Sequence, residues 1–156
     1  MKYGGNYASA LGLILAAKEK YNTAQVIFAP GGDVQETGAA NCLLISDSEV
    51  VTKPLSSEFL PGITRDSLLK VAEKLGYKVT ERNIHATEFM EWIKTGEVAL
   101  SGTAAVLAPI GEIVYQGETY QVNQGNEPVN AKRLRKHLND IQQGLEEDSF
   151  GWITKI

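Results

Sequence analysis

The sequence predicts an α+β domain in which a curled, largely antiparallel sheet, of the pseudo-barrel kind, is flanked by helices. Two observations predict this class. Short apolar segments typical of strands outnumber the segments with helical periodicity, and most neighbouring strands are joined by turns of the hairpin type. The length of 156 residues, of which 43% are hydrophobic, is sufficient for one domain with a substantial core. We therefore expect a single domain over residues 1–156.

The first part of the chain combines a helix with short strands. Residues 7–21 are predicted to form a helix that buries an apolar face marked by Ala8, Leu11 and Leu15. The segments that follow are typical of strands and turns. They are a hairpin with arms at 24–29 and 34–36 around the turn at 30–33, then a buried strand at 41–46 that a turn at 47–48 joins to a second strand at 49–52.

The second part of the chain alternates between the two kinds of element. In chain order, the predicted elements are a helix that opens within 60–66 and ends at 75, a strand over 77–83, a helix over 87–96, a strand over 98–100, a strand pair around the turn at 117–118, and a helix over 130–144. Gly76 closes the first of these helices, and Thr87 is expected to cap the next one.

Composition excludes several classes of function. A net charge of −4 and a pI of about 5.2 provide no basic surface for nucleic acid or for an anionic membrane. The longest apolar run, around residues 11–17, is too short to span a membrane. Cys42 is the single cysteine and the start lacks a signal-peptide pattern, so we expect a cytoplasmic protein. His85 and His137 lie far apart without ligand-spaced partners, which argues against a metal site.

The start of the chain places a lysine beside two glycines and a tyrosine. A lysine amine can form a Schiff base when its pKa is lowered, and pyridoxal phosphate is the cofactor that most often exploits this chemistry. Lys2 would be that amine, and Tyr7 could hydrogen-bond the phenolic oxygen of the cofactor ring. The alternative is a flexible N-terminal segment with no ligand.

Two further segments supply groups that the same cofactor needs. Thr64 stands at a helix N-terminus, where free backbone amides favour a phosphate, although it could instead be a simple helix cap. The small residues of 101–104 could expose amides to an anion, or could form a tight bend without a ligand. Glu36 could keep a proton on the pyridine nitrogen, or could be a solvated carboxylate at a strand end. An amine, a carboxylate and phosphate-binding amides in one chain favour pyridoxal phosphate over the separate alternatives.

The order of these segments also resembles a known family. The shared motifs are Lys-Tyr-Gly-Gly-Asn-Tyr at 2–7, Glu-Thr-Gly-Ala-Ala-Asn at 36–41, Leu-Pro-Gly-Ile-Thr-Arg-Asp at 60–66, Ser-Gly-Thr-Ala-Ala at 101–105 and Asp-Ser-Phe-Gly-Trp at 148–152. With them the chain resembles the C-terminal half of branched-chain amino acid aminotransferase, a fold-type IV pyridoxal-phosphate enzyme, over essentially its whole length. Ala99 departs from the aromatic residue that the family commonly has there.

The resemblance implies roles for single residues. Lys2 would bind the cofactor covalently and move the substrate proton, while Tyr7 and Glu36 would contact the ring hydroxyl and the ring nitrogen. The remaining implied contacts are Leu60 on a ring face, backbone amides of Ile63, Thr64 and Thr103 on the phosphate, and amides of Thr103 and Ala104 on the substrate carboxylate.

The reaction that the resemblance implies moves the amino group of leucine, isoleucine or valine to 2-oxoglutarate. Family members carry an N-terminal domain before the lysine, and here only Met1 precedes Lys2. We therefore expect a cofactor-binding half that needs an N-terminal domain or a second copy as its partner, with little activity alone. The alternative is a non-catalytic domain of the same fold that binds a phosphate ligand or a partner chain.

Overall fold

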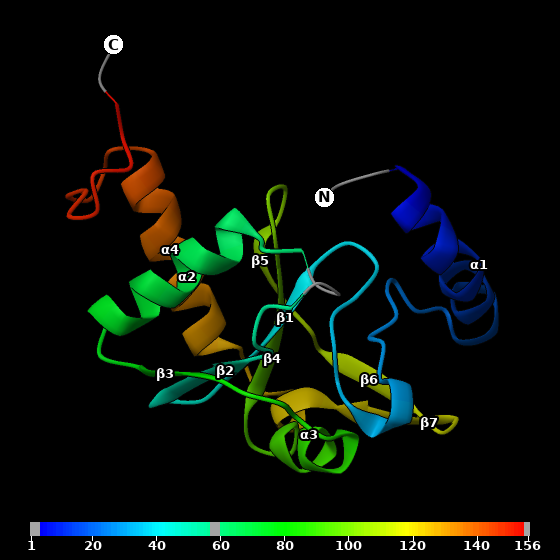
Figure 1. Ribbon diagram of the computed structural model, residues 1–156. Helices are drawn as coiled ribbons and strands as arrows, with labels where there is room; N and C mark the ends of the chain where they lie inside the picture. The colour runs from blue at the N-terminus through cyan, green and yellow to red at the C-terminus, as the bar shows by residue number, and fades with distance from the viewer. Residues whose placement is uncertain (1–3, 57–59, 155–156) are drawn as a thin grey trace.

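The protein is described by a computed structural model that covers residues 4–56 and 60–154. A five-stranded sheet forms its centre, with strand order β3-β2-β1-β4-β5, and a separate two-stranded ribbon pairs β6 with β7 (Figure 1). The strands are β1 (Asn41–Ile45), β2 (Glu49–Thr52), β3 (Lys78–Glu81), β4 (Glu97–Gly102), β5 (Val106–Pro109), β6 (Glu112–Tyr115) and β7 (Glu118–Gln121). The helices are α1 (Gly4–Tyr21), α2 (Ile63–Lys74), α3 (Ala86–Trp92) and α4 (Val129–Gln142), with short 3₁₀ turns at η1 (Pro30–Gly32) and η2 (Val122–Gly125).

The sheet separates two hydrophobic clusters because successive side chains of a strand point to opposite faces. On β1, Leu43 and Ile45 point to the face that α2 and α4 cover, whereas Cys42 and Leu44 point to the face of α3. Figure 1 shows α2 and α4 side by side on one face and α3 on the other. The strand is buried throughout, so β1 is the centre of the fold.

Strand pairing confirms the predicted α+β class with a largely antiparallel sheet. β1 pairs antiparallel with both β2 and β4, and β4 with β5. β2 and β3 run parallel, because α2 carries the chain back across the sheet between them. Among the described residues the sheet stays open, with β3 and β5 at its two edges, rather than closing into a pseudo-barrel.

The hairpin over 24–36 forms around a 3₁₀ turn at Pro30–Gly32, but its arms pair only over a short stretch. Ile27 and Thr37 form an antiparallel bridge, and backbone hydrogen bonds join Phe28 with Gln35 and Glu36. Two other local predictions were wrong. The cap of α3 is His85 rather than Thr87, since the His85 side chain accepts a hydrogen bond from the Thr87 amide. β5 was not predicted at all.

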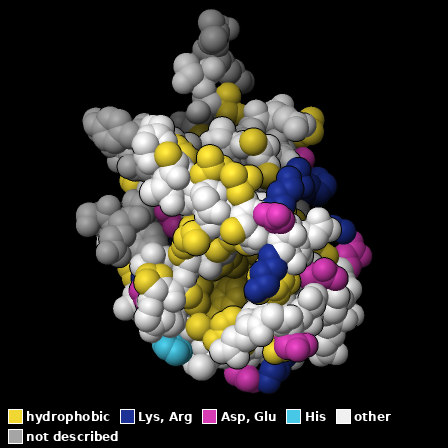
Figure 2. All heavy atoms as spheres, turned by 90° about the vertical axis from the view of Figure 1, so that its right-hand side faces the viewer, with side chains coloured by type: hydrophobic (Ala, Val, Ile, Leu, Met, Phe, Trp, Pro, Cys, Tyr) yellow, Lys and Arg dark blue, Asp and Glu magenta, His cyan; other side chains and the backbone are white. Residues whose placement is uncertain are grey.

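The prediction that α1 buries the face of Ala8, Leu11 and Leu15 was also wrong. Leu11 and Leu15 are 51% and 55% exposed. The helix meets the rest of the protein on another side, where Ala10 and Ile14 lie against Gly38. In Figure 1, α1 stands apart from α2 and α4, and Figure 2 shows hydrophobic side chains gathered around a hollow on this side of the molecule.

The C-terminal segment packs at the opposite end of the molecule, beyond α4 (Figure 1). Asp148 accepts hydrogen bonds from the amides of Phe150 and Ile153, and Phe150 stacks on Trp152 with ring centroids 4.2 Å apart. Phe150 also packs against the cluster beneath α2 and α4. In the part of the chain that the structure describes, no helix is long and apolar enough to span a membrane.

Candidate functional site

The side chain of Asn41 joins two parts of the predicted site. Its amide Nδ2 lies 2.6 Å from Glu36 Oε2 and 3.1 Å from the backbone oxygen of Leu60, and donates a hydrogen bond to each. Asn41 opens β1 and is only 9% exposed. Two predicted residues that are 24 positions apart in sequence, Glu36 and Leu60, are therefore held together by one residue for which no role was predicted.

Glu36 lies in a mixed electrostatic environment. Burial raises the pKa of its carboxyl above the ordinary value, while a hydrogen bond from the Leu60 backbone, the Asn41 amide and the positive charge of Arg65 each lower it. Burial is the largest of these effects. A carboxylate that is half-buried and hydrogen-bonded on one side is suited to a fixed, positively charged partner, such as a protonated ring nitrogen.

Arg65 is a second residue for which sequence reasoning gave no role. It lies in the first turn of α2, is 4% exposed, and hydrogen-bonds the Lys53 backbone oxygen at 2.8 Å and Glu81 at 2.5 Å. These contacts join the start of α2 to the C-terminal ends of β2 and β3. The arginine therefore fixes the helix end and adds positive charge near Glu36.

The N-terminus of α2 is open to a ligand. Gly62 is the N-cap and offers no side chain to the first turn. The first helical hydrogen bond runs from the Asp66 amide to the Gly62 oxygen, so the preceding amides have no partner within the helix. Ile63 is 84% exposed, and Thr64 is partly exposed beside it. This end of α2 combines accessible amides with the positive end of the helix dipole, as an anion site requires.

The turn after β4 lies beside the same region. Asn41 pairs with Ser101 across β1 and β4, and Gly102 comes close to the backbone oxygen of Ala39. Thr103 and Ala104 follow in the turn and are exposed. Val106 ends the turn with φ of +60°, a conformation that a β-branched residue adopts at a cost. The predicted segments at 36–41, 60–66 and 101–105 are thus neighbours in space.

The structure describes only part of the first predicted segment, residues 2–7. Lys2 lies outside the described residues. Tyr7 is 39% exposed near the start of α1, and α1 reaches the loop 37–40 through Gly38. No described hydrogen bond joins Tyr7 to Glu36 or to α2, so its predicted contact with a cofactor ring stays a prediction.

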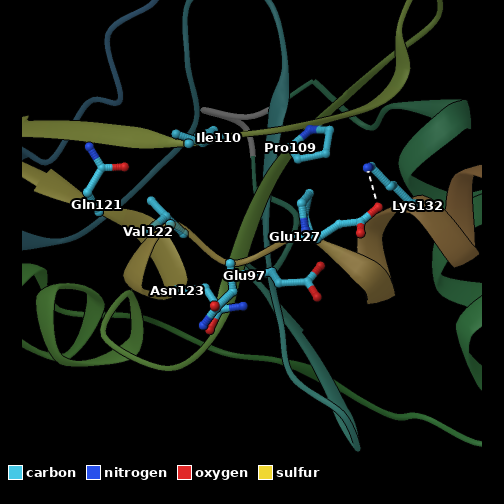
Figure 3. A pocket seen from close by; sticks show the side chains of 12 residues that line it. Glu97, Pro109, Ile110, Gln121, Val122, Asn123, Glu127 and Lys132 are labelled. Carbon is cyan, nitrogen blue, oxygen red and sulfur yellow. Dashed lines mark hydrogen bonds and ion pairs between the residues drawn. The ribbon is translucent and has the colours of Figure 1, made fainter.

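A pocket of about 390 Å³ lies elsewhere, between the start of β6, the end of β7 and the start of α4 (Figure 3). Glu97, Gln121 and Asn123 are among the polar residues around it, and Lys132 pairs with Glu127 at its side. No predicted site residue lines it. Among the described residues, no group of His, Cys, Asp or Glu is placed to hold a metal ion.

The sequence of residues 4–113 matches the family described as "Amino-transferase class IV". The chain belongs to the class IV aminotransferases. This family is of fold type IV and confirms the resemblance found in the motifs.

Curated class IV relatives are similar along the whole chain. Branched-chain-amino-acid aminotransferase 2 of Bacillus subtilis (strain 168) is 37% identical, over 99% of this chain and 44% of its own length. A probable branched-chain-amino-acid aminotransferase of Staphylococcus epidermidis (strain ATCC 35984) is 34% identical, over 99% of this chain and 45% of its own. The chain therefore spans less than half the length of these relatives.

Solved structures of class IV aminotransferases show the same fold. The branched-chain amino acid aminotransferase from Escherichia coli superimposes with a TM-score of 0.80 at 31% identity, over 97% of this chain and 49% of that one. The T.th. branched-chain amino acid aminotransferase, in complex with N-(5'-phosphopyridoxyl)-L-glutamate, gives a TM-score of 0.82 at 26% identity, over 98% and 49% of the two chains.

Proposed function

We propose that this chain is the cofactor-binding half of a pyridoxal-phosphate aminotransferase that transfers the amino group of leucine, isoleucine or valine to 2-oxoglutarate. The observation that carries the proposal is the position of the Glu36 carboxylate, held by Asn41 beside the open N-terminus of α2. A carboxylate for the ring nitrogen and amides for a phosphate are the two groups that this cofactor requires of the fold. The relatives named as branched-chain aminotransferases support the choice of substrates.

The residues fit the cofactor on structural grounds. Gly62 has no side chain, so nothing from the cap blocks the first amides of α2. Ile63 and Thr64 would offer their amides to the phosphate together with Thr103, and Leu60 would pack on a ring face. Bound pyridoxal phosphate supplies an electron sink for the bond that breaks at the substrate α-carbon.

The chain's own residues would hold and move protons around that group. Glu36 would keep a proton on the ring nitrogen, and Tyr7 would donate to the ring oxygen. The Lys2 amine would take the proton from the substrate α-carbon and deliver it to C4′ of the cofactor. Amides of Thr103 and Ala104 would orient the substrate carboxylate, which aligns the bond to be broken.

We also propose that residues 1–156 form one domain that works in the cytoplasm with a protein partner. Tyr7, Leu11 and Leu15, spaced four residues apart, leave an apolar face of α1 exposed, which favours association with another polypeptide. The remainder of a class IV aminotransferase, or a second copy of this chain, would cover that face. The chain alone would turn over little, because groups that clamp the substrate from the other side would come from the partner.

The test begins with the purified chain and added pyridoxal phosphate. The expected result is a visible absorbance band that hydroxylamine removes, and borohydride reduction followed by peptide mapping should place the label on Lys2. Mapping is needed because the α-amino group of Met1, with a pKa of about 7.7–8.0, competes with the lysine. Lys2→Ala should lose the band and keep the unfolding midpoint. A band of full strength in Lys2→Ala would overturn the assignment of Lys2.

Activity is tested by adding a separately expressed N-terminal half of the Bacillus subtilis relative. Glutamate formed from leucine and 2-oxoglutarate should rise well above the level of either half alone. A wild-type chain that stays colourless with pyridoxal phosphate would overturn the proposed function in favour of a non-catalytic domain of the same fold. Full turnover by this chain alone would overturn the need for a partner.

A further inference from the structure

We propose that Asn41 is a positioning residue, which holds the Glu36 carboxylate and the anion-binding end of α2 at a fixed separation. The inference rests on the proposed function, because the two groups serve opposite ends of one cofactor. Asn41 would hold these two groups at their separation before any ligand binds. Both ends of the Asn41 amide make contacts that support this role.

The nitrogen end of the amide links two segments. Asn41 Nδ2 donates to Glu36 Oε2 at 2.6 Å and to the Leu60 oxygen at 3.1 Å. A primary amide has two N–H groups, so both bonds are made at once by a neutral side chain. Leu60 precedes the N-cap of α2 by two residues, which ties the carboxylate to the helix end.

The oxygen end of the amide is packed against the cap itself. A Cβ built on Gly62 would lie 2.3 Å from Asn41 Oδ1, a distance far inside van der Waals contact. Gly62 is therefore the residue that lets the helix N-terminus approach the amide, and its missing side chain serves this contact as well as the open first turn.

The backbone of Asn41 gives the amide a rigid base. Asn41 begins the central strand and pairs with Ser101 of β4, while Leu43 and Leu44 farther along the strand are fully buried. Ser101 is itself 1% exposed. An amide on such a base is fixed in orientation, which makes it suited to positioning a more exposed carboxylate.

The test uses pyridoxal phosphate as the probe and Asn41→Leu as the main variant. Leucine has a branched shape like that of asparagine but donates no hydrogen bond. The dissociation constant, measured from the visible band, should rise about tenfold to a hundredfold, the usual effect of losing a hydrogen bond to a charged group. Asn130→Ala is the matched control, because Asn130 Nδ2 also donates to a carboxylate, that of Glu97, in another part of the protein.

A second measurement does not depend on the cofactor. Carbon-13 NMR of labelled glutamate in the free chain follows the titration of Glu36. The pKa of Glu36 should be higher in Asn41→Leu than in the wild type, because the amide favours the charged carboxylate. Asn130→Ala should leave this titration unchanged. A purely structural role for Asn41 would lower the unfolding midpoint without moving the Glu36 titration in the folded chain.

Gly62→Ala provides a variant that keeps the amide but displaces it. Because the new methyl group would collide with Asn41 Oδ1, cofactor binding should weaken, and Asn41→Ala in the same chain should remove the collision. The effects of the two changes should therefore not add. Additive effects would contradict the contact on which the inference depends.

The outcomes separate the inference from the proposed function. A wild-type chain that forms no band with pyridoxal phosphate would overturn both. A wild type that binds, with an Asn41→Leu variant that binds equally well and titrates identically at Glu36, would overturn the inference alone. If Asn41→Leu does not fold, an unchanged affinity in the Gly62→Ala variant would overturn it.

Discussion

Glu97 Oε2 accepts a 2.7 Å hydrogen bond from the backbone amide of Ala131 in the first turn of α4. Its other carboxylate oxygen, Oε1, accepts a hydrogen bond from the backbone amide of Asn130 at 2.9 Å. A negative charge from β4 therefore already occupies the N-terminus of α4, although the pocket of Figure 3 lies beside it. The N-cap of α2 is Gly62, and no side chain makes a capping hydrogen bond at this helix end. We therefore expect an anionic ligand to bind at the N-terminus of α2 rather than at that of α4.

Thr64→Ala tests this difference between the two helix ends. If the Thr64 hydroxyl supports a phosphate at the α2 N-terminus, its loss should weaken phosphate or pyridoxal-phosphate binding by about 0.5–1.5 kcal/mol, and by more if the phosphate charge strengthens the bond. Isothermal titration measures the change. Thr87→Ala at the start of α3 is the control and should bind as the wild type does. Equal losses in both variants would contradict the assignment.

Glu36→Gln should make the stability of the protein less dependent on pH. Because burial raises the pKa of Glu36 above 4.5, the folded chain binds this proton more tightly than the unfolded chain does. The free energy of unfolding therefore falls as the pH rises from about 4.5 through the raised pKa. Glutamine cannot ionise, and its oxygen can still accept from Asn41, so the variant should gain stability relative to the wild type across this range.

Urea unfolding at a series of pH values measures that gain. The difference between variant and wild type should increase through the range and then level off, because Glu36 is ionised in both states above its folded pKa. Glu118→Gln, on the exposed strand β7, is the control. A difference that is the same at every pH would contradict the role of burial at Glu36.

Cys42 should be unreactive in the folded chain. It is 5% exposed within β1, and burial raises the pKa of its thiol from 9.0 to about 12. The thiolate fraction at neutral pH is then about a thousandfold lower than in the unfolded chain, and the thiolate is the reactive form. Ellman's reagent should label the thiol at the rate of unfolding, and at once in urea. Rapid labelling without denaturant would show that β1 opens locally.

Changing the exposed face of α1 should reduce self-association. Leu11→Glu with Leu15→Lys replaces two side chains that are 51% and 55% exposed and introduces an i, i+4 ion pair of the favourable orientation. Sedimentation velocity should show a shift toward monomer, with stability changed by less than about 0.5 kcal/mol. Leu145→Glu, at a residue that is 73% exposed near the other end of the molecule, should have no such effect.

Much of the fold was predictable from the sequence because its signals are local. The buried strand at Asn41–Ile45 and the helix closed before Gly76 follow from apolar patterns and turn residues within a few positions. β5 was missed because it ends in Pro109, a residue that a strand tolerates at the edge of a sheet, as here. The parallel pairing of β2 with β3 depends on the path of α2, which local patterns do not show.

The face of α1 was mispredicted for a related reason. The run at 11–17 is apolar on nearly all sides of a helix, so its spacing does not show which side meets the protein. The contact of Ala10 and Ile14 with Gly38 determines which side of the helix faces the protein. Gly38 lies outside the helix in sequence, so the spacing of residues within the helix does not reveal this contact.

The candidate site was predictable as a set of segments but not as an arrangement. Motifs indicated Glu36 and Thr64 separately, whereas Asn41 and Arg65, which lie inside two of the same motifs, received no role. Their importance depends on contacts with Leu60, Glu81 and the Lys53 backbone that form only when the sheet assembles. A small polar residue at the start of an otherwise apolar buried strand was the available signal for Asn41.

The weak attachment of α1 gives the protein two levels of local stability. Among the described residues, neither hydrophobic cluster contains a side chain from α1, so separating this helix from Gly38 breaks none of the core packing. Its amides then exchange with solvent through a local opening whose free energy is only a fraction of that for unfolding the sheet. The helix is thereby a semi-independent part of the fold, and we expect its order to increase when a second polypeptide covers its exposed leucines.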